Sequence, residues 1–376
     1  MDVVKPTGLY ITFDGEQRLS FEIEGAINYK GGRSEVLRLD TEGLNRALEF
    51  MGRDIATYHR VGDKEGRDSW RERAKREGSL LYEKLFAAYP DLMQKFGMAC
   101  QATGEGENLI LCFAGPRNHL GMPYELLYDT EPLAVRYPLC RQVTGVPSRI
   151  QSLSDFLAAL RKQKLSLRVL LIASNTGGID PDGETQILEE QIRQKTDALK
   201  IKAEVKRVST DEASIKAVEQ LLNRCAYHIV HYAGHGYFDA ATGEDSGLVF
   251  WSKPKQQGGV ARLTARALAQ RLQGSETVLF YLSSCVGSTV GGEHLLHSSD
   301  YLGVMDAIVQ AGVPVVLGYR WYVTDSSAKR FASNFYNALF ETQSPPQAAL
   351  HARREIYIQD ATDETWTSPI LVTQKL

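Results

Sequence analysis

A histidine and a cysteine each follow a run of apolar residues and precede a glycine-rich turn. His235 lies between Gly234 and Gly236 after the run YHIVHYA, and Cys285 ends the run ETVLFYLSS and precedes VGSTVGG. A thiol is a strong nucleophile only as the thiolate, and a neighbouring imidazole can accept or balance its proton. These residue types predict a Cys-His dyad for acyl transfer, with Cys285 as the nucleophile and His235 as the general base.

Backbone N–H groups at the same two turns could supply an oxyanion hole. We assign these donors to Gly236 and Cys285, because glycine lets the backbone approach a substrate closely. No Asp or Asn is placed as an obvious third member, so a dyad is expected. The cysteine follows the histidine by 50 residues, from 235 to 285, and this is about the spacing described for caspases. The caspase box QACxG is absent, since the sequence here is SSCVG.

The segments around these residues predict the sheet that positions them. From LRVLLIAS onward, runs rich in Val, Ile and Leu alternate with amphipathic segments. The predicted strands are residues 167–174, 201–209, 227–236, 276–285 and 313–323, and the predicted helices are residues 184–199, 211–225, 263–273 and 300–312. This alternation predicts an α/β fold, a mostly parallel sheet flanked by helices on both faces. The carboxyl ends of its strands, where functional groups gather, carry His235 and Cys285.

The chain begins with a different pattern. The stretch GLYITFDGEQRLSFEIEG alternates apolar and polar residues around Asp14 and Gly15, which predicts a β-hairpin. Residues 41–62 and 68–96 have helical periodicity. A smaller α+β portion is therefore expected before the α/β part.

Composition limits the classes of partner. The net charge of −3, from 43 basic and 46 acidic residues, gives no overall field that would attract nucleic acid or a membrane surface. No secretory signal or membrane-spanning run is recognised at the N-terminus or elsewhere. The cysteines are five in number and include no CxxC pair, which predicts reduced thiols in the cytoplasm. His294 and His297 are a weak metal signal, so neither a metal site nor a cofactor is expected.

Several segments resemble one known family. HYAGHG at residues 231–236 and LSSC at residues 282–285 resemble the signature strands of the CHAT family, which is caspase-like and related to separase. MPYELL at residues 122–127 is similar to a proline-containing segment of that family, and the C-terminal segments GVMDAIVQAGVPVVLGYRWYVTD, FASNFYNAL and AALHARRE follow its pattern. The resemblance spans roughly residues 75–376.

The resemblance implies a domain division and a function. Residues 1–66 would be an accessory segment with the hairpin and a helix, residues 67–159 the non-catalytic first half of the CHAT region, and residues 160–376 the caspase-like catalytic half. The implied activity is that of a regulated cysteine endopeptidase that cleaves a specific protein substrate and responds to a protein activator. Bacterial stress or antiphage defence is the expected setting. No membrane or direct nucleic-acid partner is expected.

Substrate-binding residues are expected at the loops around the dyad. The candidates are Asp239, Arg320, Trp321 and Tyr322, and an acidic pocket preferring Arg or Lys could also include Glu244, Asp245 and Asp306. The loop at residues 286–299 could block the cleft of a zymogen.

Two other functions remain open. A catalytically idle CHAT-like scaffold would bind a protein partner through its sheet edge. A nucleotide-binding α/β enzyme would use Ser174–Gly178, but this glycine signal lacks the lysine of a phosphate-binding loop.

Overall fold

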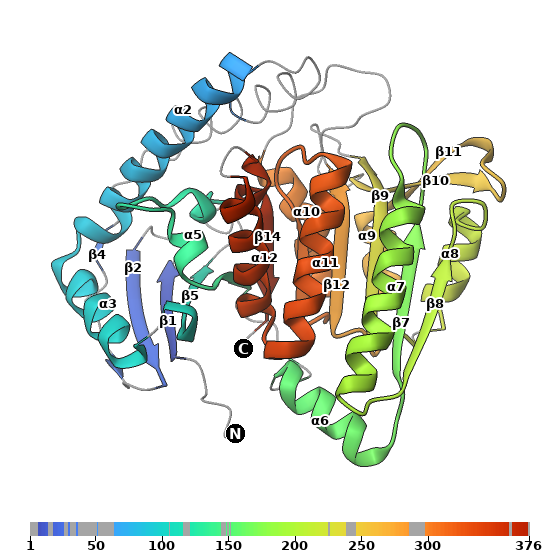
Figure 1. Cartoon of the computed structure of the whole chain (residues 1–376), viewed down its shortest axis with the longest axis horizontal. Helices are drawn as coiled ribbons and strands as arrows, with labels where there is room; N and C mark the ends of the chain where they lie inside the picture. The colour runs from blue at the N-terminus through green and yellow to red at the C-terminus, as the bar shows by residue number, and fades with distance from the viewer. Residues whose placement is uncertain are drawn as a thin grey trace.

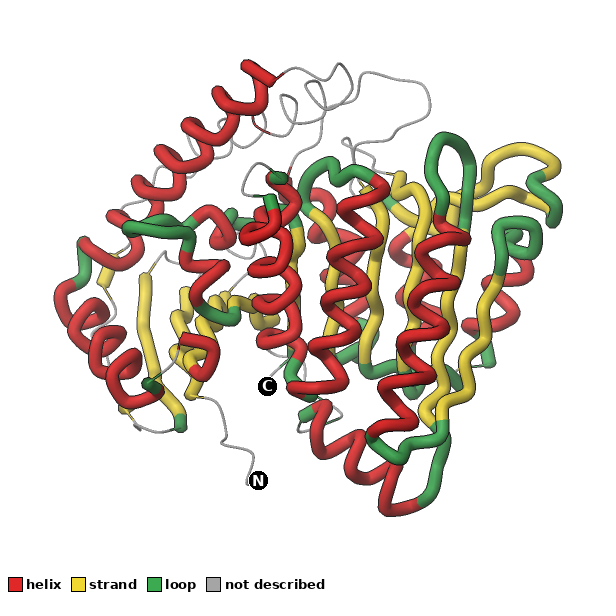
Figure 2. Tube along the Cα trace, viewed as in Figure 1, coloured by secondary structure: helices red, strands yellow, loops and turns green. Residues whose placement is uncertain are grey.

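The fold is a single mixed sheet covered by helices. The computed structural model describes residues 7–13, 18–25, 29–30, 35–36, 51, 64–104, 106–115, 121–143, 148, 150, 152–224, 226–237, 246–285, 298–360 and 363–374. These residues form a 14-stranded sheet with helices packed on its faces (Figure 1), and Figure 2 shows one helical layer in front of the strands. The predicted α/β class with a mostly parallel sheet is confirmed.

The second half of the chain forms a parallel block of strands. Its parallel strands are β7 (Leu167–Ala173), β8 (Ala203–Val208), β9 (Ile229–Tyr237), β12 (Leu279–Cys285) and β13 (Val315–Tyr319). β9 lies at the centre of this block, because it pairs with β7 on one side and β12 on the other. An antiparallel hairpin of β10 (Gly247–Lys253) and β11 (Gln257–Thr264) extends from the end of β9.

Two layers of helices enclose this block because its inner strands are apolar on both faces. The helices are α6 (Leu153–Gln163), α7 (Pro181–Ala198), α8 (Ile215–Leu222), α9 (Ala265–Leu272), α10 (Ser298–Gln310), α11 (Asp325–Thr342) and α12 (Pro345–Gln359). Val169 and Leu171 share a core with α6, α7, α11 and α12, whereas Leu170 and Ile172 share one with α8, α9 and α10. This alternation follows the two-residue period of a strand.

The first half of the chain adds a second block. Its strands are β1 (Thr7–Phe13), β2 (Arg18–Glu24), β3 (Tyr29–Lys30), β4 (Glu35–Val36), β5 (Leu109–Gly115) and β6 (Leu139–Val143). β1 and β2 pair antiparallel, which confirms the predicted hairpin. β1 also pairs with β5, and β5 with β6, both in parallel. The hairpin is thus part of the main sheet.

The predicted helix at residues 68–96 is divided in the structure. The segment consists of α2 (Lys64–Tyr82), a π-helical turn η1 (Glu83–Ala87) and α3 (Pro90–Thr103). Tyr89 has φ −122° and ψ 89°, so the backbone leaves the helical region before Pro90 begins α3. Proline has no N–H and restricts the residue before it, which explains the break. The other predicted helix, at residues 41–62, lies outside the described residues except for Met51.

The C-terminal strand joins the two blocks. β14 (Pro369–Thr373) pairs antiparallel with β13 and parallel with β6, so the parallel strands of the two blocks run in opposite directions. Short segments η2 (Gly106–Asn108), η3 (Tyr124–Leu126), α5 (Leu133–Arg136) and η4 (Glu364–Thr367) complete the connections. In the described part of the chain, no helix has the length and apolar character needed to span a membrane.

A buried charged cluster reinforces this junction. Glu125 of η3 forms a two-pronged pair with Arg141 of β6, and Arg353 of α12 lies 3.8 Å from the same carboxylate. Arg141 and Arg320 both donate to the carbonyl of Met122, at 2.7 and 3.1 Å. Because the members of this cluster come from both halves of the chain, the predicted boundary near residue 160 is bridged by buried ionic contacts.

Candidate active site

The sheet register places the backbones of His235 and Cys285 side by side. In the parallel pair of β9 and β12, Cys285 is the direct partner of His235. Neighbouring strands lie about 4.8 Å apart, so the two residues meet at the carboxyl ends of adjacent strands. For Cys285, the structure describes only the backbone. The sequence prediction that both residues occupy this edge therefore agrees with the register.

His235 is held by a backbone carbonyl. Its side chain is buried, and Nε2 lies 2.5 Å from the carbonyl oxygen of Gly177. Since a carbonyl only accepts hydrogen bonds, Nε2 carries the hydrogen and, in the neutral ring, Nδ1 carries the lone pair. Burial lowers the pKa of His235, and the Gly177 carbonyl opposes this change only in part. The neutral imidazole, which a general base requires, is therefore favoured.

The Gly177 carbonyl is positioned by a structured loop between β7 and α7. Asn175 Oδ1 accepts from the N–H of Gly177 at 2.8 Å, and Asn175 Nδ2 donates to the carbonyl of Ile179 at 2.8 Å. The carbonyl of Asn175 accepts from the indole of Trp251 at 2.7 Å. Gly177 and Gly178 have φ values of +141° and +76°, a region that favours glycine. This loop orients the imidazole through the main chain.

Sequence reasoning missed this third partner. From the sequence, Ser174–Gly178 suggests only a glycine-rich nucleotide-binding loop, and a backbone carbonyl as third partner has no side-chain signature of its own. A usable signal exists in the sequence, because an Asn two residues before a glycine pair at a strand end predicts an Asx turn. Such a turn would direct a backbone carbonyl toward the neighbouring strand end.

A cavity of about 200 Å³ opens beside His235. It lies on the face of the sheet that α7 and α11 cover. The described residues that line it are Gly177, Gly178, Ile179, Pro181, Glu184, Ala233, Gly234, His235, Ser283, Tyr322, Val323, Asp325 and Ala328. The cavity thus extends from His235 to the first turns of two helices.

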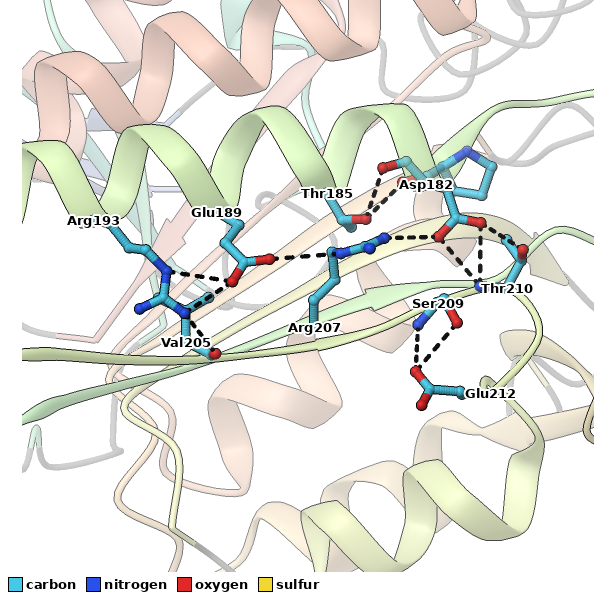
Figure 3. A network of polar contacts seen from close by, with 10 residues as sticks. Asp182, Thr185, Glu189, Arg193, Val205, Arg207, Ser209, Thr210 and Glu212 are labelled. Atoms are coloured by element: carbon cyan, nitrogen blue, oxygen red, sulfur yellow. Dashed lines mark hydrogen bonds and ion pairs between the residues drawn. The ribbon is translucent and has the colours of Figure 1, made fainter.

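A polar network fixes α7, which forms one side of the cavity. Arg207 of β8 contacts Asp182 at 3.1 Å and Glu189 at 3.6 Å, and both acids belong to α7 (Figure 3). Thr210 donates to Asp182 at 2.5 Å, and Arg193 donates to Glu189 at 2.8 Å. These contacts join the helix to the strand beneath it along two turns, so the first turn of α7 has a defined place beside His235.

The predicted substrate-binding residues occupy different environments. Tyr322 lines the cavity. Arg320 is buried and donates to the carbonyls of Gly121 and Met122, and Trp321 is buried and donates to Thr367 Oγ1 at 3.0 Å. These two side chains support the wall of the cavity from inside the protein.

Of the predicted acidic residues, only Asp306 is among the residues that the structure describes. Asp239, Glu244 and Asp245 lie outside the described residues. Asp306 is in α10, which packs on the opposite face of the sheet with the core of Met305 and Ile308. Among the described residues, the acidic side chains that line the cavity are Glu184 and Asp325, which the sequence did not indicate.

The predicted oxyanion donors lie at the strand ends. Gly236 follows His235, is partly exposed, and pairs with Leu248 of β10. Cys285 is the last residue of β12. Their roles as oxyanion donors stay predictions.

The fold and the two strand ends define the class of protein. The α/β sheet carries a histidine and a cysteine at adjacent strand ends, which is the arrangement expected of a cysteine peptidase-like fold. The model of the CHAT domain family matches residues 75–374. The chain therefore belongs to the CHAT family, and the resemblance inferred from the sequence is confirmed.

Solved structures show distant similarity. The complex of the pro- and mature domains of RgpB from Porphyromonas gingivalis has 10% identity and a TM-score of 0.46, and the match covers 76% of this chain and 69% of that one. The Saccharomyces cerevisiae separase, in a complex with securin, has 10% identity and a TM-score of 0.48. That match covers 99% of this chain and 30% of the separase chain, so this chain spans less than a third of separase. Among curated proteins, none matches this sequence.

Proposed function

We propose that this CHAT protein is a cysteine endopeptidase that cleaves a specific protein substrate. The observation that carries the proposal is the direct pairing of Cys285 with His235 at the carboxyl ends of β12 and β9. Three further features support it: the neutral state favoured for His235, its contact with the Gly177 carbonyl, and the adjoining cavity. A peptidase needs a nucleophile, a base and a place for the substrate side chain, and these features provide candidates for each.

The proposed reaction proceeds through an acyl-enzyme. His235 accepts the thiol proton of Cys285, and the thiolate attacks the scissile carbonyl carbon. The C–S bond forms while the carbonyl π electrons move to oxygen, where the N–H groups of Gly236 and Cys285 donate to the oxyanion. The C–N bond then breaks, and the leaving amine takes the proton from His235. Water attacks the thioester with His235 as base, which releases the carboxylic acid and restores the thiol.

The Gly177 carbonyl has a positioning role in this scheme. Its hydrogen bond to Nε2 leaves Nδ1 as the nitrogen that exchanges protons with Cys285 and the leaving amine. The carbonyl dipole also stabilises the imidazolium that forms transiently. The neutral group does this without the full charge of an aspartate.

Regulation and setting are further proposals that the family resemblance supports. We infer that the enzyme cleaves a specific protein substrate and is controlled by a protein activator or regulator, in bacterial stress or antiphage defence and in the cytoplasm. We expect peptidase activity that depends on a co-purified or co-expressed protein partner.

The experiment that tests the peptidase compares wild type with Cys285→Ala and His235→Ala. Each protein is incubated with a peptide library, read by mass spectrometry, and with a peptidyl acyloxymethyl ketone that labels reactive cysteines. We expect cleavage and labelling in wild type and a loss of about a thousandfold or more in either variant. Cleavage that persists in Cys285→Ala would contradict the assignment. Partner binding without cleavage or labelling, with all candidate partners present, would favour the scaffold.

A further inference from the structure

The cavity beside His235 has an acidic lining. Glu184 of α7 and Asp325 of α11 both contribute to it, and the described residues that line it include neither Lys nor Arg. A cavity with this lining favours a cationic guest, because the carboxylates lose part of their hydration there.

Glu184 is the deeper of the two carboxylates. Its side chain is about 4% exposed, and Oε1 lies 2.9 Å from Nε2 of His231. Nδ1 of His231 lies 3.4 Å from the hydroxyl of Tyr336. Burial raises the pKa of Tyr336 well above its ordinary value, so this hydroxyl stays protonated and donates to Nδ1. With Tyr336 as the donor to Nδ1, His231 donates from Nε2 to the carboxylate of Glu184.

Asp325 has a cation nearby already. Lys329 lies 3.1 Å from its carboxylate and 2.7 Å from that of Asp180, and it holds the pKa of Asp180 below its usual range. The Asp325 side chain is 35% exposed. Glu184 is therefore the principal carboxylate available to a guest, with Asp325 as a secondary charge.

The depth of Glu184 selects for a long side chain. His231, which holds Glu184, precedes His235 by four residues on β9, a distance of about 13 Å along a strand. Glu184 and His235 line the same cavity, and Glu184 lies below the strand ends, so a long basic side chain extends further toward it than a short side chain does. Ile179, Pro181 and Val323 provide apolar walls for its methylene groups.

A hydroxyl in the cavity adds a second polar contact. Ser283 Oγ is buried, and the structure gives it no hydrogen-bond partner among the residues it describes. Ser283 lines the cavity and lies two residues before Cys285 on β12. A buried hydroxyl without a partner is costly, and a guest N–H group would satisfy it.

We propose that this cavity binds the substrate side chain immediately before the scissile bond, and that this residue is arginine or lysine, paired with Glu184. The inference rests on the proposed peptidase function. Arginine should be preferred to lysine, because its planar guanidinium can donate to Glu184 and Ser283 together.

The first test needs no mutation of the enzyme. Fluorogenic peptides that differ only in the residue before the scissile bond, arginine, lysine, citrulline, leucine or aspartate, are compared by kcat/KM. Citrulline has nearly the shape of arginine without its charge. We expect arginine to exceed citrulline by about a hundredfold or more, since a site built for a polar group rejects an analogue that lacks it. Cysteine-dependent cleavage with a preference for citrulline, leucine or aspartate would overturn the pocket assignment and leave the peptidase standing.

The second test uses Glu184→Gln, which keeps the shape of the side chain and an acceptor for His231. We expect kcat/KM for the arginine peptide to fall about a hundredfold, while alkylation of Cys285 by iodoacetamide keeps the wild-type rate. Glu341→Gln is the matched control, because Glu341 is an exposed acid of α11 with 64% side-chain exposure. An unchanged preference for arginine in Glu184→Gln would overturn the proposal.

A binding measurement separates the two proposals if no peptide is cleaved. Calorimetry on Cys285→Ala with the arginine peptide and its citrulline analogue reports the pocket without the chemistry. Binding that needs both the arginine charge and Glu184 would support the pocket even while the peptidase proposal fails. Equal affinity for the two peptides would overturn the pocket.

Discussion

The indole ring of Trp70 packs edge-on against that of Trp321, with the ring centroids 6.3 Å apart. Trp70 belongs to α2 and precedes the residues that match the CHAT family, whereas Trp321 directly precedes Tyr322 of the cavity wall. Trp70 also donates to the carbonyl of Met51 at 2.9 Å. The wall of the candidate active site is therefore supported by a helix that begins before the matched domain.

Truncating Trp70 should destabilise the protein. Trp70→Ala is expected to lower the free energy of unfolding by about 3 to 5 kcal/mol, because it leaves a cavity in a buried aromatic contact. Trp70→Phe should cost less, and Glu72→Ala, at an exposed position of the same helix, should change it by less than about 0.5 kcal/mol. Urea unfolding followed by fluorescence measures these differences. Equal stability of Trp70→Ala and Glu72→Ala would refute the supporting role.

The buried pair of Glu125 and Arg141 should make stability depend on pH. Burial opposes ionisation of Glu125, but Arg141, with Arg353 and Arg320, outweighs burial and lowers its pKa. A carboxyl whose pKa is lower in the folded state contributes stability above its unfolded pKa of about 4.3 and loses it as pH falls further. Unfolding measured from pH 7 to pH 3 should show this loss.

Breaking that pair at neutral pH should also be costly. Glu125→Gln should lower the free energy of unfolding by about 3 to 5 kcal/mol, because it leaves buried guanidinium groups without their carboxylate. The matched control is Glu77→Gln, whose partner Arg76 has 73% side-chain exposure, and it should cost about 1 kcal/mol or less. A small loss in Glu125→Gln would show that the cluster contributes little to the junction.

The acid limb of peptidase activity should reflect the environment of His235. Burial lowers the pKa of this imidazole, and the base must be unprotonated to accept the thiol proton. Activity is lost as pH falls through the pKa, so the acid limb of kcat/KM should lie below the ordinary histidine value of about 6.5. A pH–rate profile on a cleaved peptide measures this. An acid limb above pH 6.5 would contradict the inferred environment.

Removing the Asn175 side chain should disturb the base indirectly. Asn175→Ala deletes the groups that hold Gly177 and Ile179, and a small displacement of the carbonyl should lower kcat by about tenfold to a hundredfold. KM should change less than kcat, because Asn175 does not itself line the cavity, whereas the Gly177 carbonyl that it positions contacts His235 directly. Asn175→Asp keeps the acceptor for the Gly177 N–H and should retain more activity. Equal kcat values for all three proteins would rule out this positioning role.

Much of the fold could be predicted because it depends on local patterns. The apolar runs of β7, β9 and β12 and the hairpin of β1 and β2 are visible as periodicity, and parallel strands bring His235 and Cys285 to one edge without further information. The break before Pro90 could also be predicted, because proline disfavours the helical conformation in the residue before it. Proline itself gave the necessary signal.

The cavity could not be predicted, because its members meet only through tertiary packing. Glu184 has the sequence signature of an acid in the first turn of a helix, which is ordinary capping chemistry. Its contact with His231 depends on where α7 crosses β9, and the polar network to Arg207 determines that crossing. Asp325 is likewise an acid at a helix start, and its place in the lining depends on how α11 packs beside α7.

The acceptor that holds His235 is the main-chain carbonyl of Gly177, so substitutions at this position affect it differently from substitutions of a side-chain acceptor. A carbonyl group belongs to every amino acid, so a scan of single substitutions at position 177 would delete no carbonyl acceptor. Its losses would reflect the preference of φ +141° for glycine and the position of residue 177 in the cavity lining. Adding or removing one residue between Ala173 and Pro181, by contrast, would carry the carbonyl away from Nε2. The length and curvature of this loop therefore determine how well His235 is oriented as a base. Inserting one residue into the loop should lower activity more than most single substitutions in it.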